Sequence, residues 1–212
     1  MFGEVIKYKK SKLSGGSVIM LVRGDDGRTY LPLIKAPWKR EFEEFGGKVD
    51  MCETGEECAW REFAEEGSDL VTNLGIDKVY YLDKVKLEMK IGISKDKFWT
   101  VVVVLVEKIL PTVHLSVASE LKFLDTKYLN KGSVVSCKFF SVDDIYGPGR
   151  KRRDFNDEWF CLSGRTRRIL SDRRIRSMIE NCAKNHYSYP VDESNAIILD
   201  RPTPPLENRL EC

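Results

Sequence analysis

The order of hydrophobic and polar positions predicts two groups of β-strands, one near the start of the chain and one in its middle. Residues 2–35 contain short apolar runs separated by turn-forming residues at 14–16 and at 24–27. The Asp-Gly pair in the second of these turns is a strong hairpin signal. Residues 77–110 return to strand chemistry, with Ser-Lys-Asp-Lys at 94–97 as the connecting turn. The sequence therefore predicts hairpins in both regions.

Two segments lack the strand pattern and predict helices. Residues 54–66 begin with Thr54 and have Glu57 three positions later, which is the spacing of a capping box at the start of a helix. Residues 163–185 also predict a helix, although their apolar positions form an irregular stripe, and a further strand is expected at 134–142. Strands, helix, strands and helix in this order predict an α+β fold with a mixed sheet.

The composition is that of one folded domain with a short tail. The chain has 212 residues, of which 42% are hydrophobic and 32% are charged, and domains usually contain roughly 100–200 residues. We expect a single domain over residues 1–190. Residues 191–212 include Asp-Arg-Pro-Thr-Pro-Pro at 200–205. Because proline cannot continue a helix or a central strand, we expect this end to form a loose tail.

Several classes of protein are disfavoured by the sequence. The longest apolar run, Val101–Val106, is far shorter than the roughly 20 residues that span a bilayer, and the chain does not begin with a secretory signal pattern. The six cysteines are scattered without a CxxC pair and there are two histidines, which disfavours a zinc site. We therefore expect free thiols, a cytoplasmic location and no membrane partner.

Residues 41–69 are strongly acidic, with eleven Asp or Glu and two basic residues. Glu62, Glu65 and Glu66 stand at i, i+3 and i+4, so their carboxylates share one face of the predicted helix. Like charges at these spacings cost about 0.2–0.5 kcal/mol each in an isolated helix. Such a face is either simply solvated, or it binds a hard divalent cation with oxygen ligands, such as Mg²⁺, which offsets the repulsion between the carboxylates.

The residues around this face occur at a spacing that favours the cation. Gly46-Gly47 lets the backbone approach a ligand closely, Glu53 follows six residues after Gly47, and Arg61 follows eight residues after Glu53. The pattern Gly47-x5-Glu53-x7-Arg61-Glu62-Phe63-x-Glu65-Glu66 resembles the signature of the Nudix hydrolases, which cleave nucleoside diphosphates linked to another moiety. We call residues 46–69 the box.

The resemblance implies a fold and departs from the family at one end. It implies the Nudix α/β/α sandwich, in which a mixed sheet lies between helices and the box forms a loop–helix–loop. Where the family has Gly followed by an apolar residue, this chain has Ser68 and Asp69. We expect Gly67 to supply the left-handed end of the helix one residue early.

The resemblance also implies a metal site in the box. Glu65 and Glu66 are expected to bind Mg²⁺ or Mn²⁺, together with the backbone carbonyl of Gly46. Glu62 is expected to be a further metal ligand or the general base that takes a proton from the attacking water. A bound divalent ion neutralises charge on a pyrophosphate and lowers the pKa of bound water.

Two further roles follow from the resemblance. Arg61 is expected to orient carboxylates by charge-assisted hydrogen bonds, with Glu53 as its partner. The catalytic set is then Glu62, Arg61 and Glu53. Many relatives take one more acid from outside the box, for which Glu120 is the first candidate, with Glu107 and Asp125 behind it.

A basic segment late in the chain bears on the substrate. Residues 150–176 contain ten Lys or Arg and four acids, a net charge of +6, and arginine suits phosphate groups better than lysine does. Three aromatic residues lie among them and can stack on bases, namely Phe155, Trp159 and Phe160. Candidate contacts to substrate phosphates or RNA are Lys48, Arg150, Arg152, Arg153, Arg165, Arg167 and Arg168. The alternative is a solvated basic helical segment over 150–185, and Trp38 and Trp99 are expected in the core or sheet.

The box is also similar to that of poxvirus-type and related large-DNA-virus mRNA-decapping Nudix enzymes. The residues that carry this likeness are Gly46-Gly47-Lys48-Val49-Asp50, Glu53, Cys58, Arg61-Glu62 and Glu65-Glu66. The first candidate substrate is therefore the 5′–5′ triphosphate of capped mRNA, with release of 7-methyl-GDP. A small-molecule hydrolase acting on oxidised dNTPs, ADP-ribose, dinucleoside polyphosphates or diphosphoinositol phosphates is the alternative. A catalytically silent Nudix module that senses nucleotides or binds RNA is a third hypothesis, which the retained Glu and Arg residues of the box disfavour. The oligomeric state stays open.

Overall fold

In the computed structural model, an eight-stranded mixed sheet forms the centre of the described part of the molecule. The structure describes residues 13–36, 38–91, 94–111, 121–124, 134–146, 161–185 and 192–199. The strands are β1 (Leu13–Gly24), β2 (Thr29–Lys35), β3 (Phe45–Gly47), β4 (Lys78–Ile91), β5 (Ser94–Leu110), β6 (Leu121–Leu124), β7 (Val134–Ser141) and β8 (Ala196–Ile198). The helices are α1 (Gly55–Leu74), α3 (Val142–Tyr146), α4 (Gly164–Ser171) and α5 (Arg173–Lys184), with a 3₁₀ turn η3 at Glu193–Asn195.

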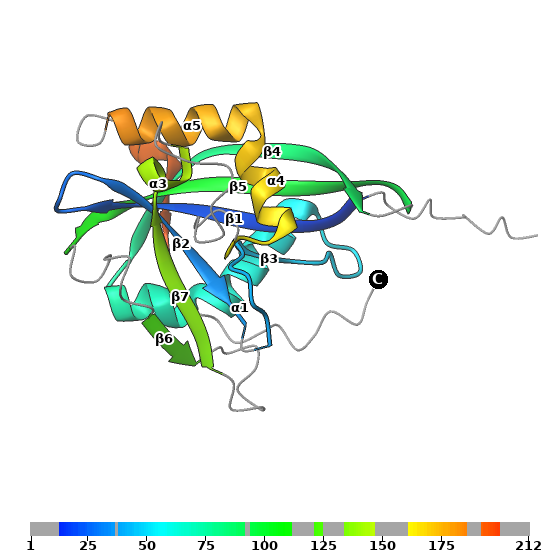
Figure 1. The fold of residues 1–212 in the computed structure, drawn as a ribbon, viewed down its shortest axis with the longest axis horizontal. Helices are drawn as coiled ribbons and strands as arrows, with labels where there is room; N and C mark the ends of the chain where they lie inside the picture. Colours follow the sequence, from blue (N-terminus) through cyan, green and yellow to red (C-terminus); the bar gives the residue numbers. More distant parts are fainter. Residues whose placement is uncertain are drawn as a thin grey trace, which may run out of the picture.

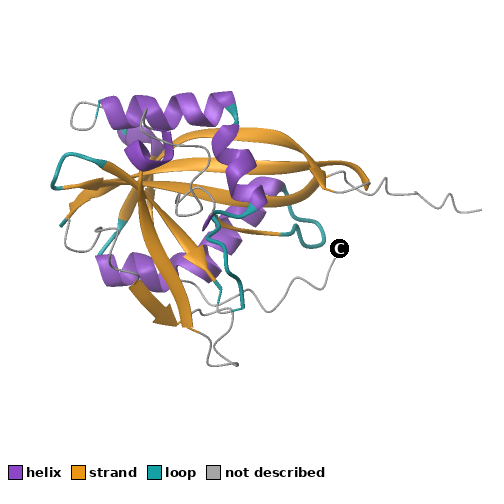
Figure 2. Ribbon diagram, in the orientation of Figure 1, coloured by secondary structure: helices purple, strands orange, loops and turns teal. Residues whose placement is uncertain are grey.

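Helices cover both faces of the sheet (Figures 1 and 2). α1 packs on one face with a core that includes Val18, Phe45 and Phe63. α3, α4 and α5 lie on the other face, over a second core that includes Leu21 and Ile169. The α+β fold with a mixed sheet between helical layers, which the sequence predicted, is confirmed.

The strand order places β1 at the centre of the sheet. The order is β6-β7-β2-β1-β5-β4-β8, and β1 and β5 run parallel while the other neighbours are antiparallel. Val101–Val106 of β5 is almost completely buried, as expected for a strand that has helices on both faces. This apolar run is a core strand, and no helix in the described residues has the length and hydropathy needed to cross a bilayer.

β3 is short, and its place on β1 positions the box. β2 pairs with β1 at only two registers, Val22↔Tyr30 and Arg23↔Thr29. The first part of β1 therefore has an edge that β3 occupies, with Ser17 opposite Gly46.

Two predicted turns differ from the structure, and a third is confirmed. Residues 14–16 belong to β1, because Gly15 and Gly16 leave room for neighbours: a Cβ on Gly16 would lie 1.9 Å from the Gly55 carbonyl oxygen. Residues 94–97 belong to β5, so the β4–β5 connection is shorter than expected. The turn at 24–27 is present, with Gly27 at a φ of 83°.

Helix α1 begins as predicted but is longer. Thr54 accepts a hydrogen bond from the Glu57 N–H and the Glu57 side chain accepts one from the Thr54 N–H, which is a capping box. The expected end at Gly67 is wrong: Gly67 lies inside the helix, where a Cβ would come within 3.2 Å of the Phe63 ring. The left-handed end is Gly75, with a φ of 61°, because the buried face continues through residues 70–74.

The predicted helix over 163–185 consists of two helices. Asp172 has an extended backbone and its side chain accepts hydrogen bonds from the N–H groups of Arg174 and Ile175. It therefore ends α4 and caps α5, which explains why the apolar positions do not follow a single helical stripe.

The C-terminal boundary also differs from the sequence prediction. Residues 196–198 form β8 on the edge of β4, and Glu193 bonds to the side chains of Lys78 and Tyr80, each at 2.8 Å. Residues 193–195 thus form the turn η3 and residues 196–198 belong to the sheet, so this part of the chain is not a loose tail. Residues 200–212 lie outside the described part of the chain, as do residues 1–12.

Candidate functional site

Glycines bring the box loop and α1 close to the central strands. A Cβ on Gly47 would lie 2.0 Å from Glu62 Oε1, so glycine at this position leaves room for the Glu62 carboxylate beside the loop. Gly16 does the same for the first turn of α1, as described above. The close approach of Gly47 to Glu62 is the structural reason why the box has a glycine here.

Arg61 is the centre of the box. Its guanidinium holds Glu53 in a bidentate pair, with Nε 2.8 Å from Oε1 and Nη2 3.1 Å from Oε2. Nη1 donates to Glu62 at 2.9 Å and to Glu65 at 3.2 Å. Nη2 also donates to the carbonyl of Lys48 at 3.0 Å. One arginine therefore fixes three carboxylates and the loop backbone.

The pKa values of the central pair move in opposite directions. The hydrogen bond with Glu53, followed by those with Glu62 and Glu65, raises the pKa of Arg61 against the effect of its burial. Burial on its own would raise the pKa of Glu53, but hydrogen bonds from Arg61 and from the Asp50 N–H, with the charge of Arg61, hold that pKa below its usual range. Glu53 and Arg61 are therefore an ion pair at neutral pH.

The three glutamates expected at the metal lie on one helix, α1, but in different surroundings. Glu62 is only 3% exposed, whereas Glu65 and Glu66 are partly exposed. Glu66 Oε2 accepts a hydrogen bond from the Gly46 N–H at 2.9 Å. This contact places the Glu66 carboxylate on the residue whose carbonyl is the expected backbone ligand.

The donor chemistry of this site fits a hard divalent ion. Carboxylates and a backbone carbonyl are the oxygen ligands that Mg²⁺ and Mn²⁺ prefer. Within the described residues no three His, Cys, Asp or Glu side chains are already grouped as a metal site. Instead, Nη1 of Arg61 lies between Glu62 and Glu65. The residues that would hold an ion are Glu62, Glu65, Glu66 and the carbonyl of Gly46.

Among the predicted phosphate contacts, Arg165 has an unexpected position. It was predicted as a substrate contact, but its Nε lies 2.5 Å from Glu44 Oε1 and its Nη2 lies 3.3 Å from a carboxylate oxygen of Glu43. These two carboxylates lie directly before β3. Arg165 is therefore bound to protein carboxylates next to the box. Lys48, in contrast, is exposed on the box loop.

The remaining predicted residues are divided between α4 and parts of the chain that are not described. Arg167 is partly exposed and Arg168 is exposed, and Nη2 of Arg168 donates to the Glu88 carbonyl at 3.0 Å. Several candidates lie outside the described residues, namely Glu120, Asp125, Arg150, Arg152, Arg153, Phe155, Trp159 and Phe160. The side chain of Glu107 is not described either.

The two tryptophans that were expected in the core differ from each other. Trp99 is buried, and its Nε1 donates to Ser17 Oγ at 2.9 Å. Trp38 is 57% exposed in the connection between β2 and β3, so the prediction is wrong for this residue.

Sequence reasoning missed Glu44. It is one acid in a run of acidic residues, but the structure buries it to 1% exposure. Its partners, Arg165 and Thr166, are more than 120 positions away in the chain. No local spacing distinguishes Glu44 from the more exposed acids Glu41 and Glu43, so the sequence alone carries no signal for this residue.

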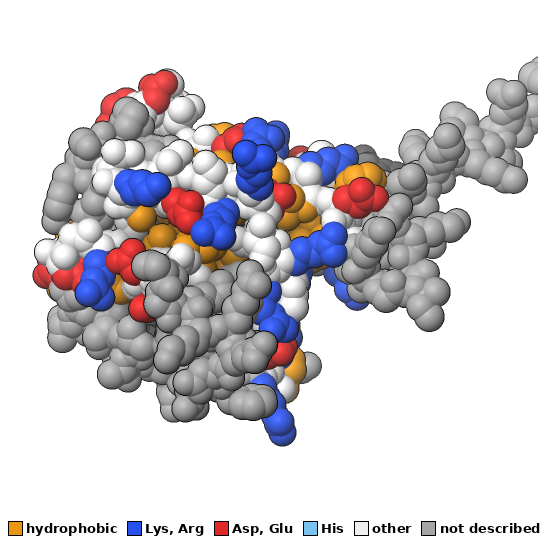
Figure 3. All heavy atoms as spheres, turned by 45° about the horizontal axis from the view of Figure 1, so that its top comes forward, with side chains coloured by type: hydrophobic (Ala, Val, Ile, Leu, Met, Phe, Trp, Pro, Cys, Tyr) orange, Lys and Arg blue, Asp and Glu red, His pale blue; other side chains and the backbone are white. Residues whose placement is uncertain are grey.

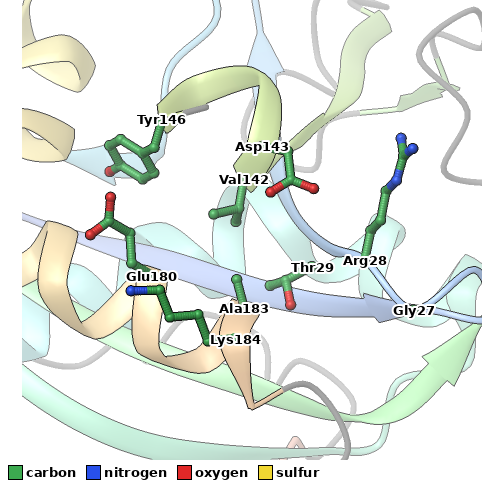
Figure 4. A pocket seen from close by; sticks show the side chains of 9 residues that line it. All are labelled: Gly27, Arg28, Thr29, Val142, Asp143, Tyr146, Glu180, Ala183 and Lys184. Carbon is green, nitrogen blue, oxygen red and sulfur yellow. The ribbon is translucent and has the colours of Figure 1, made fainter. Parts of the chain in front are cut away.

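A cavity of about 270 Å³ lies away from the box, between the β1–β2 turn, α3 and the end of α5 (Figure 4). Its lining contains two basic residues, Arg28 and Lys184, and two acidic residues, Asp143 and Glu180. None of the box residues lines it. The candidate site is therefore the box rather than this cavity.

The fold and site together define an α+β protein with a glycine loop and a carboxylate-bearing helix that packs on one face of a mixed sheet. No protein-family model matches the sequence, and no curated protein sequence matches it. Solved structures of Nudix hydrolases are similar in fold. RenU from M. smegmatis is 14% identical, with 82% of this chain and 90% of that chain covered and a TM-score of 0.46.

Two other solved structures have comparable values. The Ap4A hydrolase of C. elegans is 15% identical, with 63% of this chain and 82% of that chain covered and a TM-score of 0.39. The Bacillus subtilis pyrophosphohydrolase BsRppH is 18% identical, with 89% and 91% covered and a TM-score of 0.40. Because all three scores are below 0.5, the function proposed below depends on the residues of the box and not on these similarities.

Proposed function

We propose that this chain is a divalent-metal-dependent Nudix-type pyrophosphohydrolase that cleaves a nucleoside diphosphate linked to another group. The observation that carries the proposal is the arrangement around Arg61, which holds Glu53, Glu62 and Glu65 in one hydrogen-bonded cluster. Glu66, one position further along α1, reaches the Gly46 peptide. A face that is simply solvated would not need a central arginine that donates hydrogen bonds to five oxygen atoms.

Each residue of the box has a separate proposed role in hydrolysis. Glu65, Glu66 and the Gly46 carbonyl would hold Mg²⁺ or Mn²⁺, and such an ion neutralises pyrophosphate charge and lowers the pKa of bound water. Glu62 is the acid most protected from solvent among the three glutamates, and as general base it would accept the proton of the attacking water on a carboxylate oxygen. Arg61 keeps Glu62 and Glu65 in place during this step.

For the substrate, we propose capped mRNA, cleaved with release of 7-methyl-GDP. Support comes from α4, which packs beside the box through Arg165 and carries Arg167 and Arg168 towards solvent. Arginine side chains bind phosphate groups through paired hydrogen bonds. A chain of phosphates that leaves the box along α4 would therefore meet positive charge.

A small-molecule substrate is the second candidate, and the charge pattern of α5 favours it. Arg174 is paired with Asp83 at 2.7 Å and Arg176 with Glu180 at 3.0 Å. Basic side chains on this face are interspersed with acidic ones rather than gathered in one patch (Figure 3). An oxidised dNTP, ADP-ribose, a dinucleoside polyphosphate or a diphosphoinositol phosphate needs no long basic track.

One metal-dependent screen tests both proposals. Purified protein with Mg²⁺ or Mn²⁺ is offered cap-labelled RNA, a dNTP set, ADP-ribose, a dinucleoside polyphosphate and a diphosphoinositol phosphate at equal concentration. We expect release of 7-methyl-GDP from the RNA, and its loss in Glu66→Gln and Glu65→Gln. Glu56→Gln is the matched control, because Glu56 lies on the same helix but pairs with Lys84 outside the cluster.

The outcomes separate the hypotheses. Turnover of free nucleotides without release from capped RNA would exclude decapping and leave the hydrolase. Zero turnover across the panel with tight nucleotide binding would instead indicate a silent Nudix module that senses nucleotides or binds RNA.

A further inference from the structure

Glu44, which is buried, and Arg165, which is partly exposed, form an ion pair that joins α4 to the segment directly before the strand carrying Gly46. Arg165 Nε lies 2.5 Å from Glu44 Oε1, and Thr166 Oγ1 donates to Glu44 Oε2 at 2.5 Å. The backbone follows the same path, because the Phe42 N–H donates to the Cys161 carbonyl at 2.7 Å and the Ser163 N–H donates to the Phe42 carbonyl at 2.9 Å. The start of α4 is thus attached to residues 42–44.

Stability alone does not explain this pair. Removing two charges from water is expensive, and replacing a buried ion pair by apolar side chains of similar volume is often neutral or stabilising. The Glu44 side chain has no exposed surface, so its carboxylate has lost all contact with solvent and carries the full free-energy cost of desolvation. An apolar contact at this place is therefore expected to support the fold as well as the ion pair does.

Arg165 reaches the Gly46 peptide. Its Nη2 makes a long contact of 3.5 Å to the Gly46 carbonyl oxygen, while the N–H of the same residue donates to Glu66. The guanidinium also lies over the Trp99 ring, 4.7 Å from its centroid. Trp99 in turn bonds to Ser17, which is the register partner of Gly46. Arg165 and Glu66 therefore contact the C=O and the N–H of Gly46, and Trp99 packs against Arg165 beside them.

We propose that Glu44 and Arg165 are positioning residues that fix the Gly46 carbonyl and the Glu66 carboxylate for a divalent ion. This inference rests on the proposed function, which assigns both groups to the ion. A carbonyl oxygen has two lone pairs, so it can accept from Arg165 and still face a metal. Glu44 acts on Arg165, and Arg165 acts on Gly46, so neither residue touches the ion.

The test measures Mn²⁺ affinity of the full chain by electron paramagnetic resonance, together with the thermal unfolding midpoint. Arg165→Lys keeps the charge but loses the planar fork that reaches Glu44 and Gly46 together. Arg165→Met removes both contacts. We expect Kd for Mn²⁺ to rise by about 10-fold to 100-fold in both variants, which is the usual effect of losing a group that orients a metal ligand. Arg28→Met, which removes an exposed ion pair with Asp26, should leave Kd unchanged.

The double variant Glu44→Met/Arg165→Met separates positioning from simple stabilisation. Because it leaves no unpaired buried charge, its unfolding midpoint should return towards that of the wild type, while its Mn²⁺ affinity should stay low. Saturating Mn²⁺ should restore most of the turnover of Arg165→Lys. A double variant that binds Mn²⁺ like the wild type would overturn the inference, as would unchanged affinity in Arg165→Lys. A wild-type chain that binds no Mn²⁺ would overturn the proposed function itself.

Discussion

At the scale of single residues, the carboxylates of the box are positioned by hydrogen bonds from an arginine side chain rather than left as exposed charges. The resemblance to the Nudix signature implied that Arg61 and Glu53 are partners, and the structure pairs them at 2.8 Å. This pair was predictable because the two residues are only eight positions apart, with Glu53 in the loop before α1 and Arg61 inside α1. The pair of Glu44 with Arg165 was not, because it exists only after α4 has packed against β3.

Glu53 should make the stability of the fold depend on pH. Its folded-state pKa lies below the ordinary value of 4.5, so its stabilising effect is fully present above that value and is lost as pH falls through the lower, folded-state pKa. We expect the unfolding midpoint to fall less between pH 7 and pH 3 in Glu53→Gln than in the wild type. Glu56→Gln, which removes a more exposed pair of little weight, should follow the wild-type profile. Parallel profiles for all three proteins would contradict the pairing.

Gly47 should be required for activity more than for folding. A Cβ at this position would lie 2.0 Å from Glu62 Oε1, and the carboxylate at the end of a flexible side chain can move aside. Gly47→Ala is therefore expected to fold but to lose about 10²-fold in turnover, because a displacement of the order of 1 Å at a catalytic group has that effect. Gly164→Ala, where a Cβ meets no atom within 4 Å, is the control. Unchanged turnover in Gly47→Ala would show that Glu62 does not need its present place.

At the scale of elements, the sequence predicted where α1 begins better than where it ends. Thr54 and Glu57 form a local capping box that depends on four consecutive residues, so its signal was complete in the sequence. Gly67 has the residue type of a helix end, but packing of Phe63 and Phe45 against it keeps it inside α1. Tertiary contacts therefore decided the length of the helix, and these contacts have no local signature.

The division between α4 and α5 should depend on Asp172. Its side chain accepts hydrogen bonds from two N–H groups at the start of α5, at 3.0 Å from Arg174 and 3.2 Å from Ile175. Asp172→Ala should lower the free energy of unfolding by about 1 kcal/mol, the usual effect of removing such a cap. Denaturant unfolding measures the change, with Ser177→Ala on the exposed side of α5 as the control. An equal midpoint in Asp172→Ala would mean that the cap is not needed.

At the scale of the whole molecule, the net charge of +2 conceals two regions of opposite sign. The acidic region surrounds the box, and part of the basic region lies on α4, which the pair of Glu44 with Arg165 attaches to the box. The sequence predicted both regions and the mixed sheet. It could not predict which arginines face inward, because Arg165 and Arg167 are two positions apart on one helix and differ only in what packs against them.

Charge reversal on α4 should distinguish an RNA substrate from a small one. If RNA phosphates leave the box along this helix, Arg167→Glu/Arg168→Glu should weaken capped-RNA binding and reduce the slope of log K against log salt by roughly 1.4, since each single-strand phosphate contact contributes about 0.7. Turnover of a free nucleotide should stay within about twofold, because such a substrate needs only the box and makes few phosphate contacts. Arg28→Glu/Lys184→Glu changes the net charge equally at exposed positions around the cavity, and should affect neither quantity. Equal losses in the two double variants would attribute RNA binding to net charge, and unchanged RNA binding would leave a small nucleotide as the substrate.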